Sequence, residues 1–142
     1  MNVILHKDYH VEQNDFTNAG RASSQIKNTL KQIGISPAVM RRVSVAAYEA
    51  EINLLIHAYG GDISLDLMDN GDIKLRFSDK GPGIEDIEKA LTPGFSTASE
   101  KAREMGFGAG MGIPNIKRVS DEFSIVSSPA GTIIDVLIHA DE

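Results

Sequence analysis

The chain has 142 residues, a length that suits one domain spanning residues 1–142. Acidic residues outnumber basic ones by 20 to 14, and the net charge of −6 argues against a broad binding surface for nucleic acid or for an anionic membrane. The chain has no cysteine, which excludes disulfides and thiolate metal sites. It also has no apolar run typical of a membrane span and no basic leader typical of a signal peptide, so a cytoplasmic location is expected.

The N-terminal part of the sequence predicts one strand followed by two helices. Apolar residues predict a short strand over residues 2–9, and an apolar repeat every three or four residues predicts a helix over 17–33 that ends at Gly34. The dipeptide Ser36-Pro37 is typical of a helix start, and the second helix is expected to reach Ala58. Its second half is apolar on nearly all sides, which indicates a central, buried helix.

Two hairpins are predicted further along the chain. Residues 63–67 and 73–77 alternate apolar with polar side chains and flank Asn70-Gly71, a strong signal for a type I′ turn. Residues 123–127 and 132–139 predict the second pair of strands.

Between the hairpins lies a long irregular stretch, with short helices predicted over 84–91 and 112–119. Helices and antiparallel strands are segregated along the chain. This order predicts an α+β fold, a two-layer sandwich with one mixed sheet and its helices on one face.

Glycine clusters are the most informative feature of the irregular stretch. Seven of the 13 glycines lie between positions 81 and 112. Glycine lets a backbone approach a ligand closely, and a glycine-rich segment that runs into a helix can bind an anion. The spacing does not fit a P-loop, a dinucleotide-binding fingerprint or a GxSxG nucleophile turn. A flexible surface loop remains the alternative reading.

The buried helix carries polar residues that need partners. Glu49 and Asn53 are four residues apart, so they lie on one helical face, and His57 continues that stripe. Inside an apolar helix such groups need hydrogen-bond partners, unless this edge of the helix reaches solvent. Glu51 lies about 160° from Asn53 around the helix and is expected on another face.

A third motif, Asp79-Lys80-Gly81-Pro82-Gly83, directly follows a predicted strand. On its own it could be an ordinary turn started by the aspartate. His6 and His10 are four residues apart in a strand, a spacing that gives no metal site, and both are interpreted as surface residues.

Four motifs, taken together, resemble the GHKL ATP-binding superfamily, which includes gyrase B subunits, heat-shock chaperones and sensor histidine kinases. They are, in order, Glu49-x-x-x-Asn53, Asp79-x-Gly81-x-Gly83, Gly108-x-Gly110-x-Gly112 and Gly131-Thr132. Each is weak alone, but all four in this order form a specific signal over nearly the whole chain. The resemblance implies a Bergerat-type ATP-binding fold with a lid over about residues 92–108.

Within the superfamily, the chain is similar to the stand-alone serine/threonine kinases of bacterial sigma-factor control, namely the anti-sigma kinases and the stressosome switch kinase. The run EAEINLLIHAY, residues 49–59, is similar to the anti-sigma kinases, whereas Gly94-Phe95-Ser96-Thr97 and Lys117-Arg118 are similar to the switch kinase. The segment Ala98 to Met105 departs from the switch kinase by lengthening the lid. These mixed features leave the subfamily and its partner open.

The resemblance implies ATP and Mg²⁺ as cofactors. Asp79 would accept a hydrogen bond from the adenine amino group. Gly81 and Gly83 would pass beneath the base, and Thr132 would share the adenine contact directly or through water.

The remaining implied roles lie at the phosphate end of the nucleotide. Asn53 would offer its carbonyl oxygen to Mg²⁺, and Gly108, Gly110 and Gly112 would direct backbone N–H groups and a helix N-terminus at the phosphates. Glu49, one helical turn before Asn53, would accept the proton of an attacking hydroxyl.

The resemblance therefore implies a protein serine/threonine kinase that also works as an anti-sigma-type switch. Its implied partners are a sigma factor or regulator and a small antagonist of the anti-sigma-antagonist (STAS) type, and kin in this group often form homodimers. The alternative is a non-catalytic, nucleotide-gated binding module that controls a partner protein. Both share every motif and differ only in whether Glu49 is needed as a base.

Overall fold

The computed structural model describes residues 2–56, 60–81, 91 and 112–140 of the chain. The order along the described residues is one strand, a group of helices, a pair of strands, one helix and a second pair of strands, which is the broad order that the sequence predicts. The elements are β1 (Val3–Val11), the 3-10 helix η1 (Phe16–Asn18), α1 (Arg21–Gln32), α2 (Pro37–Ile56), β2 (Gly61–Met68), β3 (Ile73–Asp79), α5 (Gly112–Val119), β4 (Glu122–Ser128) and β5 (Gly131–Ile138).

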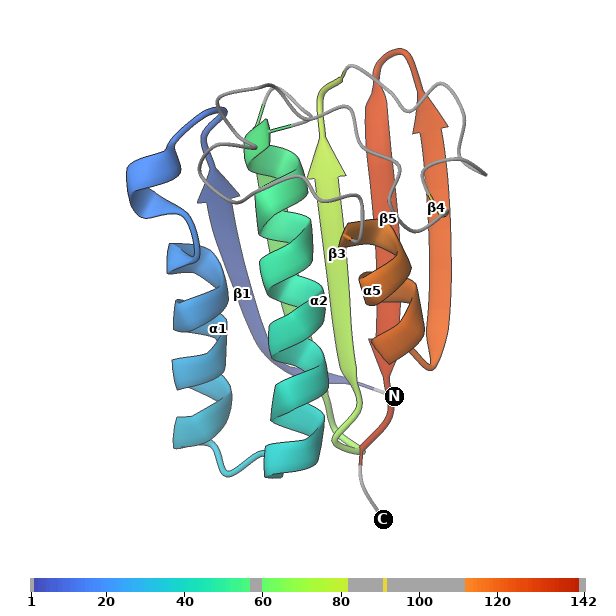
Figure 1. Cartoon of the computed structure of the whole chain (residues 1–142). Coiled ribbons are helices and arrows are strands. Elements are labelled where there is room, and N and C mark those ends of the chain that lie inside the picture. Colours follow the sequence, from blue (N-terminus) through green and yellow to red (C-terminus); the bar gives the residue numbers. More distant parts are fainter. Residues whose placement is uncertain (1, 57–59, 82–90, 92–111, 141–142) are drawn as a thin grey trace.

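The strands form one five-stranded sheet in the order β1-β2-β3-β5-β4. The helices α1, α2 and α5 all lie on one face of this sheet (Figure 1). The predicted two-layer α+β sandwich is therefore confirmed. The sheet itself is not mixed, because every neighbouring pair among the described strands is antiparallel. Strand β5 is antiparallel both to β4, with which it forms a hairpin, and to β3 on its other side.

The core lies between the helices and the covered face of the sheet. Strand β2 shows how alternating side chains form this core: Ile63 and Leu65 are fully buried, whereas Asp62, which points to the opposite face of the sheet, is exposed. From the helices, Ile26, Leu30 and Ile116 are likewise fully buried. No helix in the described ranges has the length and apolar character needed to cross a bilayer.

The ends of the first two helices follow the sequence signals in part. The predicted stop at Gly34 is confirmed, because this residue has a φ of +80° and Ile35 N donates to Leu30 O at 3.1 Å. The Ser36 cap is also confirmed, since its Oγ accepts from Val39 N at 3.3 Å. The start at residue 17 is wrong: residues 16–18 form the separate 3-10 helix, and α1 begins only after Gly20.

The β2–β3 hairpin forms as predicted, but its turn is of another type. A type I′ turn needs a positive φ at both central residues, and Asn14 is the one non-glycine residue with positive φ in the described part of the chain. Instead, Gly71 N donates to Met68 O at 2.9 Å and Gly71 itself has a φ of +90°. These features, with no positive φ at Asn70, indicate a type I turn followed by a glycine bulge. Asn70 Oδ1 also accepts from Asp72 N at 3.0 Å, which supports the bend.

Candidate functional site

The predicted site residues lie where several elements end on the same side of the molecule. The C-terminal end of α2, the end of β3 and the β4–β5 hairpin all lie at the upper end in Figure 1. Six predicted site residues belong to the described part of the chain: Glu49, Asn53, Asp79, Gly81, Gly112 and Thr132. Gly83, Gly108, Gly110 and the predicted lid over 92–108 lie outside the described residues.

Asp79, the last residue of β3, holds the bend that follows it. Its Oδ1 accepts hydrogen bonds from Gly81 N at 2.9 Å and from Thr132 N at 3.0 Å. Within the described residues, no hydrogen bond reaches its other oxygen, Oδ2. One carboxylate oxygen thus joins the β3 bend to the start of β5, while a carboxylate offers about four acceptor positions in all.

Gly131 makes this junction possible. A Cβ placed on Gly131 would lie 2.1 Å from Asp79 O, a distance no side chain tolerates, and its φ is +149°. The next residue, Thr132, is buried and its Oγ1 lies 2.8 Å from Ser127 Oγ. The close approach of β3 and β5 at Asp79 therefore requires the glycine at position 131, whereas Thr132 takes part through its backbone N–H.

Asn53 meets the first residue of α5. A Cβ on Gly112 would lie 3.0 Å from Asn53 Oδ1, so a side chain at this position would crowd the amide unless Asn53 shifted by a few tenths of an ångström. The buried Asn53 Nδ2 has no hydrogen-bond partner among the residues that the structure describes. A rotation of the side-chain amide by 180° exchanges its oxygen and its NH₂ group. Asn53 can therefore present either an acceptor or a donor without a partner near the start of α5.

An unpaired buried amide costs free energy, so it needs an explanation. A ligand oxygen at this position would accept from the NH₂ group, and in the flipped amide the oxygen would instead face a cation such as Mg²⁺, which prefers oxygen ligands. The N-terminus of α5 adds free N–H groups and the positive end of a helix dipole. The residues present therefore fit a Mg²⁺-bound phosphate group.

Glu49 lies one turn before Asn53 and is half-buried. Its Oε1 accepts from Asn115 Nδ2 at 3.4 Å, a long hydrogen bond between α2 and α5. Asn115 is not among the predicted site residues. Its signal was its position three residues after Gly112, which places it on the first turn of α5.

Glu51 faces the other way, as its helical angle predicts. It is 2% exposed, and its two oxygens accept from the backbone N–H groups of Gly20, Ala22 and Ser23 at 2.9 to 3.2 Å. The N-cap residue Gly20 has no side chain to cap α1, so Glu51 supplies the missing acceptor from the neighbouring helix. This role could not be read from the sequence.

The two strand histidines lie on the outer face of the sheet. His6 contacts Asp66 and Asp8, and His10 contacts Asp62 and Glu12. The hydrogen bond to Asp66, then that to Asp8, raises the pKa of His6 above its ordinary value. No group of three or more potential ligands that could hold a metal occurs among the described residues.

Comparison with known proteins agrees with this geometry. The model of the histidine kinase-like ATPase domain matches residues 13–138. The serine/threonine-protein kinase RsbT of Bacillus subtilis is 35% identical over 104 residues, covering 71% of this chain and 72% of that protein. An anti-sigma F factor of Caldanaerobacter subterraneus is 37% identical over 98 residues, and the match spans 65% of this chain and 64% of that protein.

Solved structures share the fold. The RsbU and RsbW domains of Rv1364c from Mycobacterium tuberculosis match with a TM-score of 0.64 at 16% identity, over 96% of this chain and 33% of that one. A chain of the SiaB–SiaC complex from Pseudomonas aeruginosa matches with a TM-score of 0.60 at 13% identity, over 96% and 89% of the two chains. The site geometry, the matched domain model and these relatives lead to one conclusion: the chain belongs to the family of histidine kinase-like ATPase domains.

Proposed function

We propose that the protein is an ATP- and Mg²⁺-dependent serine/threonine protein kinase that acts as an anti-sigma-type switch. The observation that carries this proposal is the amide of Asn53, whose buried Nδ2 has no partner in the described part of the chain, beside the start of α5, with a carboxylate, Glu49, one turn away on the same face of α2. The relatives named as a serine/threonine kinase and an anti-sigma factor support the same function.

The adenine would bind at the end of β3. Asp79 uses Oδ1 for the backbone, and its remaining acceptor positions suit the amino group of an adenine. Gly81 and Gly83 leave room for the base to lie against the backbone. The hydroxyl of Thr132 already contacts Ser127, so its second contact would be made to the base directly or through water.

The phosphates would bind between α2 and α5. Bound ATP supplies the transferable phosphoryl group, and Mg²⁺ neutralises charge on it. Asn53 would ligate the ion through its amide oxygen, and backbone N–H groups of Gly108, Gly110 and Gly112 would hold the phosphates. These residues position the reacting group, and positioning with charge neutralisation provides most of the rate in phosphoryl transfer.

Glu49 would act as the base. Its carboxylate is half-buried and held by one long hydrogen bond from Asn115. Such a group keeps acceptor positions for the hydroxyl proton of an incoming serine or threonine. Asn115 would keep the carboxylate turned toward the start of α5, where that hydroxyl must arrive.

The proposed protein partners are a sigma factor or regulator and a small STAS-type antagonist that receives the phosphoryl group. The protein would form a homodimer, which light scattering at several concentrations would reveal. The dimer is not required by the chemistry of the site.

The test is label transfer from γ-labelled ATP, with Mg²⁺, to candidate STAS-type antagonists encoded beside this chain. We expect label on a serine or threonine of one antagonist, and its loss in the Glu49→Gln variant. Tight nucleotide binding with no transfer to any antagonist would contradict kinase activity and indicate a nucleotide-gated binding module instead.

A further inference from the structure

Helix α2 carries a second, partly apolar side in addition to its core-facing side, and among the residues of that second side Met40 also packs against the core. Its core-facing side is formed by Val39, Val43, Ala46, Ala47 and Ala50, all buried. A different set repeats at the same three- and four-residue spacing along another side of the helix: Pro37, Met40, Arg41, Ser44, Val45 and Tyr48.

This second side is open to solvent. Tyr48 is 41% exposed, although it is the largest apolar side chain on this side. A surface helix in a two-layer fold normally turns polar residues outward, and an outward apolar stripe is typical of an interaction surface.

This second side forms one wall of a groove between α2 and α1. The groove has a volume of about 460 Å³, and Lys27 of α1 lines it together with the α2 residues. The two helices lie side by side along their length (Figure 1). One end of the groove is Pro37, at the start of α2, and the other is Glu49, the proposed base. The groove is therefore continuous with the catalytic end of α2.

Two of the three charged side chains that line the groove, Lys27 and Arg41, are positive, and the third is Glu49, in a chain whose net charge is −6. Among the described residues, neither Lys27 nor Arg41 forms an ion pair. Ser44 also lines the groove, but its Oγ is buried and offers no exposed polar group to a partner. Apolar side chains and two unpaired cations are together the complement of an acidic segment with apolar side chains.

From this continuity we infer that the α1–α2 groove docks the phosphoacceptor protein. The bound segment carries apolar side chains that pack on Met40, Val45 and Tyr48, and acidic side chains that pair with Lys27 and Arg41. Docking there brings the acceptor hydroxyl to the Glu49 end of the groove. This inference rests on the proposed kinase function, because it names the surface by which the kinase selects its protein substrate.

Charge reversal tests the groove. The double variant Lys27→Glu/Arg41→Glu should raise the KM for the antagonist that accepts label at least about tenfold, with nucleotide affinity within about twofold of wild type. The matched control, Lys7→Glu/Lys74→Glu, changes two exposed lysines on strands and should leave that KM unchanged. Restoration of a low KM when an acidic residue of the antagonist is changed to lysine would establish direct contact. An unchanged KM in the groove variant overturns the inference and leaves the kinase function standing.

A binding measurement separates the inference from the kinase function. Because the chain has no cysteine, Met40→Cys gives a single attachment point for an environment-sensitive fluorophore inside the groove, and Lys74→Cys gives one on the opposite face of the sheet. Titration with the same antagonist, its acceptor hydroxyl residue changed to alanine, should alter fluorescence at position 40 alone. If no candidate antagonist accepts label, the titration is made with each unmodified candidate, and a signal at position 40 alone then shows that a partner protein docks in the groove while the kinase function falls. A signal at position 40 from self-association, or none with the antagonist, overturns the groove.

Discussion

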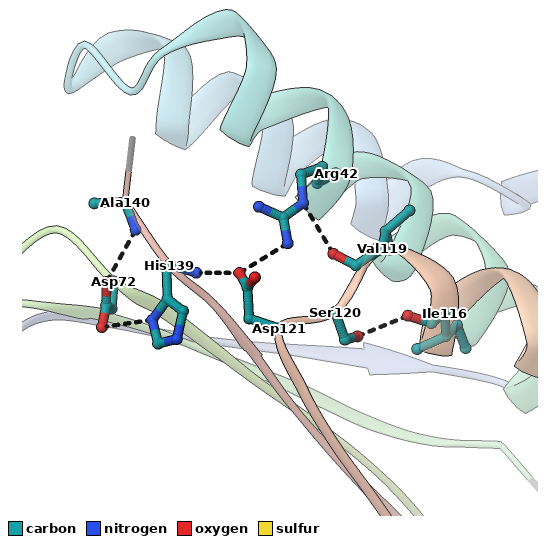
Figure 2. Close-up of polar contacts among 8 residues, drawn as sticks. All are labelled: Arg42, Asp72, Ile116, Val119, Ser120, Asp121, His139 and Ala140. Atoms are coloured by element: carbon teal, nitrogen blue, oxygen red, sulfur yellow. Dashed lines mark hydrogen bonds and ion pairs between the residues drawn. The ribbon is translucent and has the colours of Figure 1, made fainter. Parts of the chain in front are cut away.

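Helix α2 contacts α5 near both of its ends, and the polar groups are arranged differently at the two places. Toward the start of α2, Arg42 Nε donates to Val119 O, the last residue of α5, at 3.0 Å. Arg42 Nη2 also donates to Asp121 Oδ2 at 2.8 Å, and that oxygen accepts from His139 N at 2.7 Å (Figure 2). The contact continues to Asp72, which accepts from Ala140 N at 2.9 Å.

Toward the end of α2 the polar groups are left less satisfied. Within the described ranges, Asn53 Nδ2 is buried without a partner, and Glu49 accepts one hydrogen bond of 3.4 Å from Asn115. Helix α5 is therefore fixed by hydrogen bonds at its C-terminal end, whereas polar groups near its N-terminal end keep unused hydrogen-bonding capacity. Fixing one end of a short helix orients the N–H groups at the other, which is how a binding site is pre-organised at low cost.

The largest expected effect is at Glu49. Glu49→Gln keeps the shape of the side chain and the acceptor for Asn115 but removes the base, so phosphotransfer should fall about 10²- to 10⁴-fold. Nucleotide affinity, measured by calorimetry, should stay close to wild type. A Glu49→Gln protein that transfers phosphate at the normal rate would remove the base assignment.

Glu51, two residues along the same helix, provides a contrast to Glu49. Glu51→Ala leaves the N–H groups of Gly20, Ala22 and Ser23 without their acceptor, and buried unsatisfied donors are costly. We expect a loss of about 2–4 kcal/mol in the free energy of unfolding, measured by urea denaturation. Glu49→Gln serves as the control and should lose much less stability. Equal losses in the two variants would contradict the distinction between a structural and a catalytic carboxylate.

Asp79→Asn should weaken nucleotide binding about 10²-fold. The amide can still accept from Gly81 N and Thr132 N through Oδ1, so the bend is preserved. Its NH₂ group, however, would face the adenine amino group, donor against donor. Calorimetry gives the affinity and thermal unfolding checks the fold. An unchanged affinity would refute the adenine role.

The fixed end of α5 is tested by Arg42→Ala, which should cost about 1–2 kcal/mol of stability because two hydrogen bonds are lost. The matched control is Arg76→Ala, which removes an exposed pair with Asp135 on the outer face of the sheet and should cost about 0–1 kcal/mol. If the two variants unfold at the same denaturant concentration, the Arg42 contacts do not fix α5 as described.

The smallest effect is a pH dependence at the same place. The backbone N–H of His139, and then Arg42, hold the pKa of Asp121 below its ordinary value. A carboxyl group with a lowered folded-state pKa contributes stability above its unfolded value, about 3.9, and loses it as the pH falls through the folded value. We therefore expect stability to decline below about pH 4, and less steeply in Asp121→Asn. A variant with the same acid dependence as wild type would contradict this cause.

Local signals in the sequence predicted the elements that depend on neighbouring residues. Helix α5 has the predicted bounds, 112–119, and Ser36 and Gly34 cap their helices as expected. The glycine motifs also indicated the nucleotide-binding family. These features depend on backbone conformation and on spacing within one or two helical turns, so a single stretch of sequence contains them.

The remaining features depend on residues far apart in the chain, and only the tertiary structure decided them. Asp79 binds a backbone group 53 residues away, and Arg42 binds Asp121, 79 residues away. Glu51 caps a helix that begins about thirty residues before it. The sequence alone determined which residues could do chemistry and on which elements they lie. Packing of α2 against α1, α5 and the sheet decided which of them are held by hydrogen bonds and which are left open, because long-range contacts are fixed only when the whole fold forms.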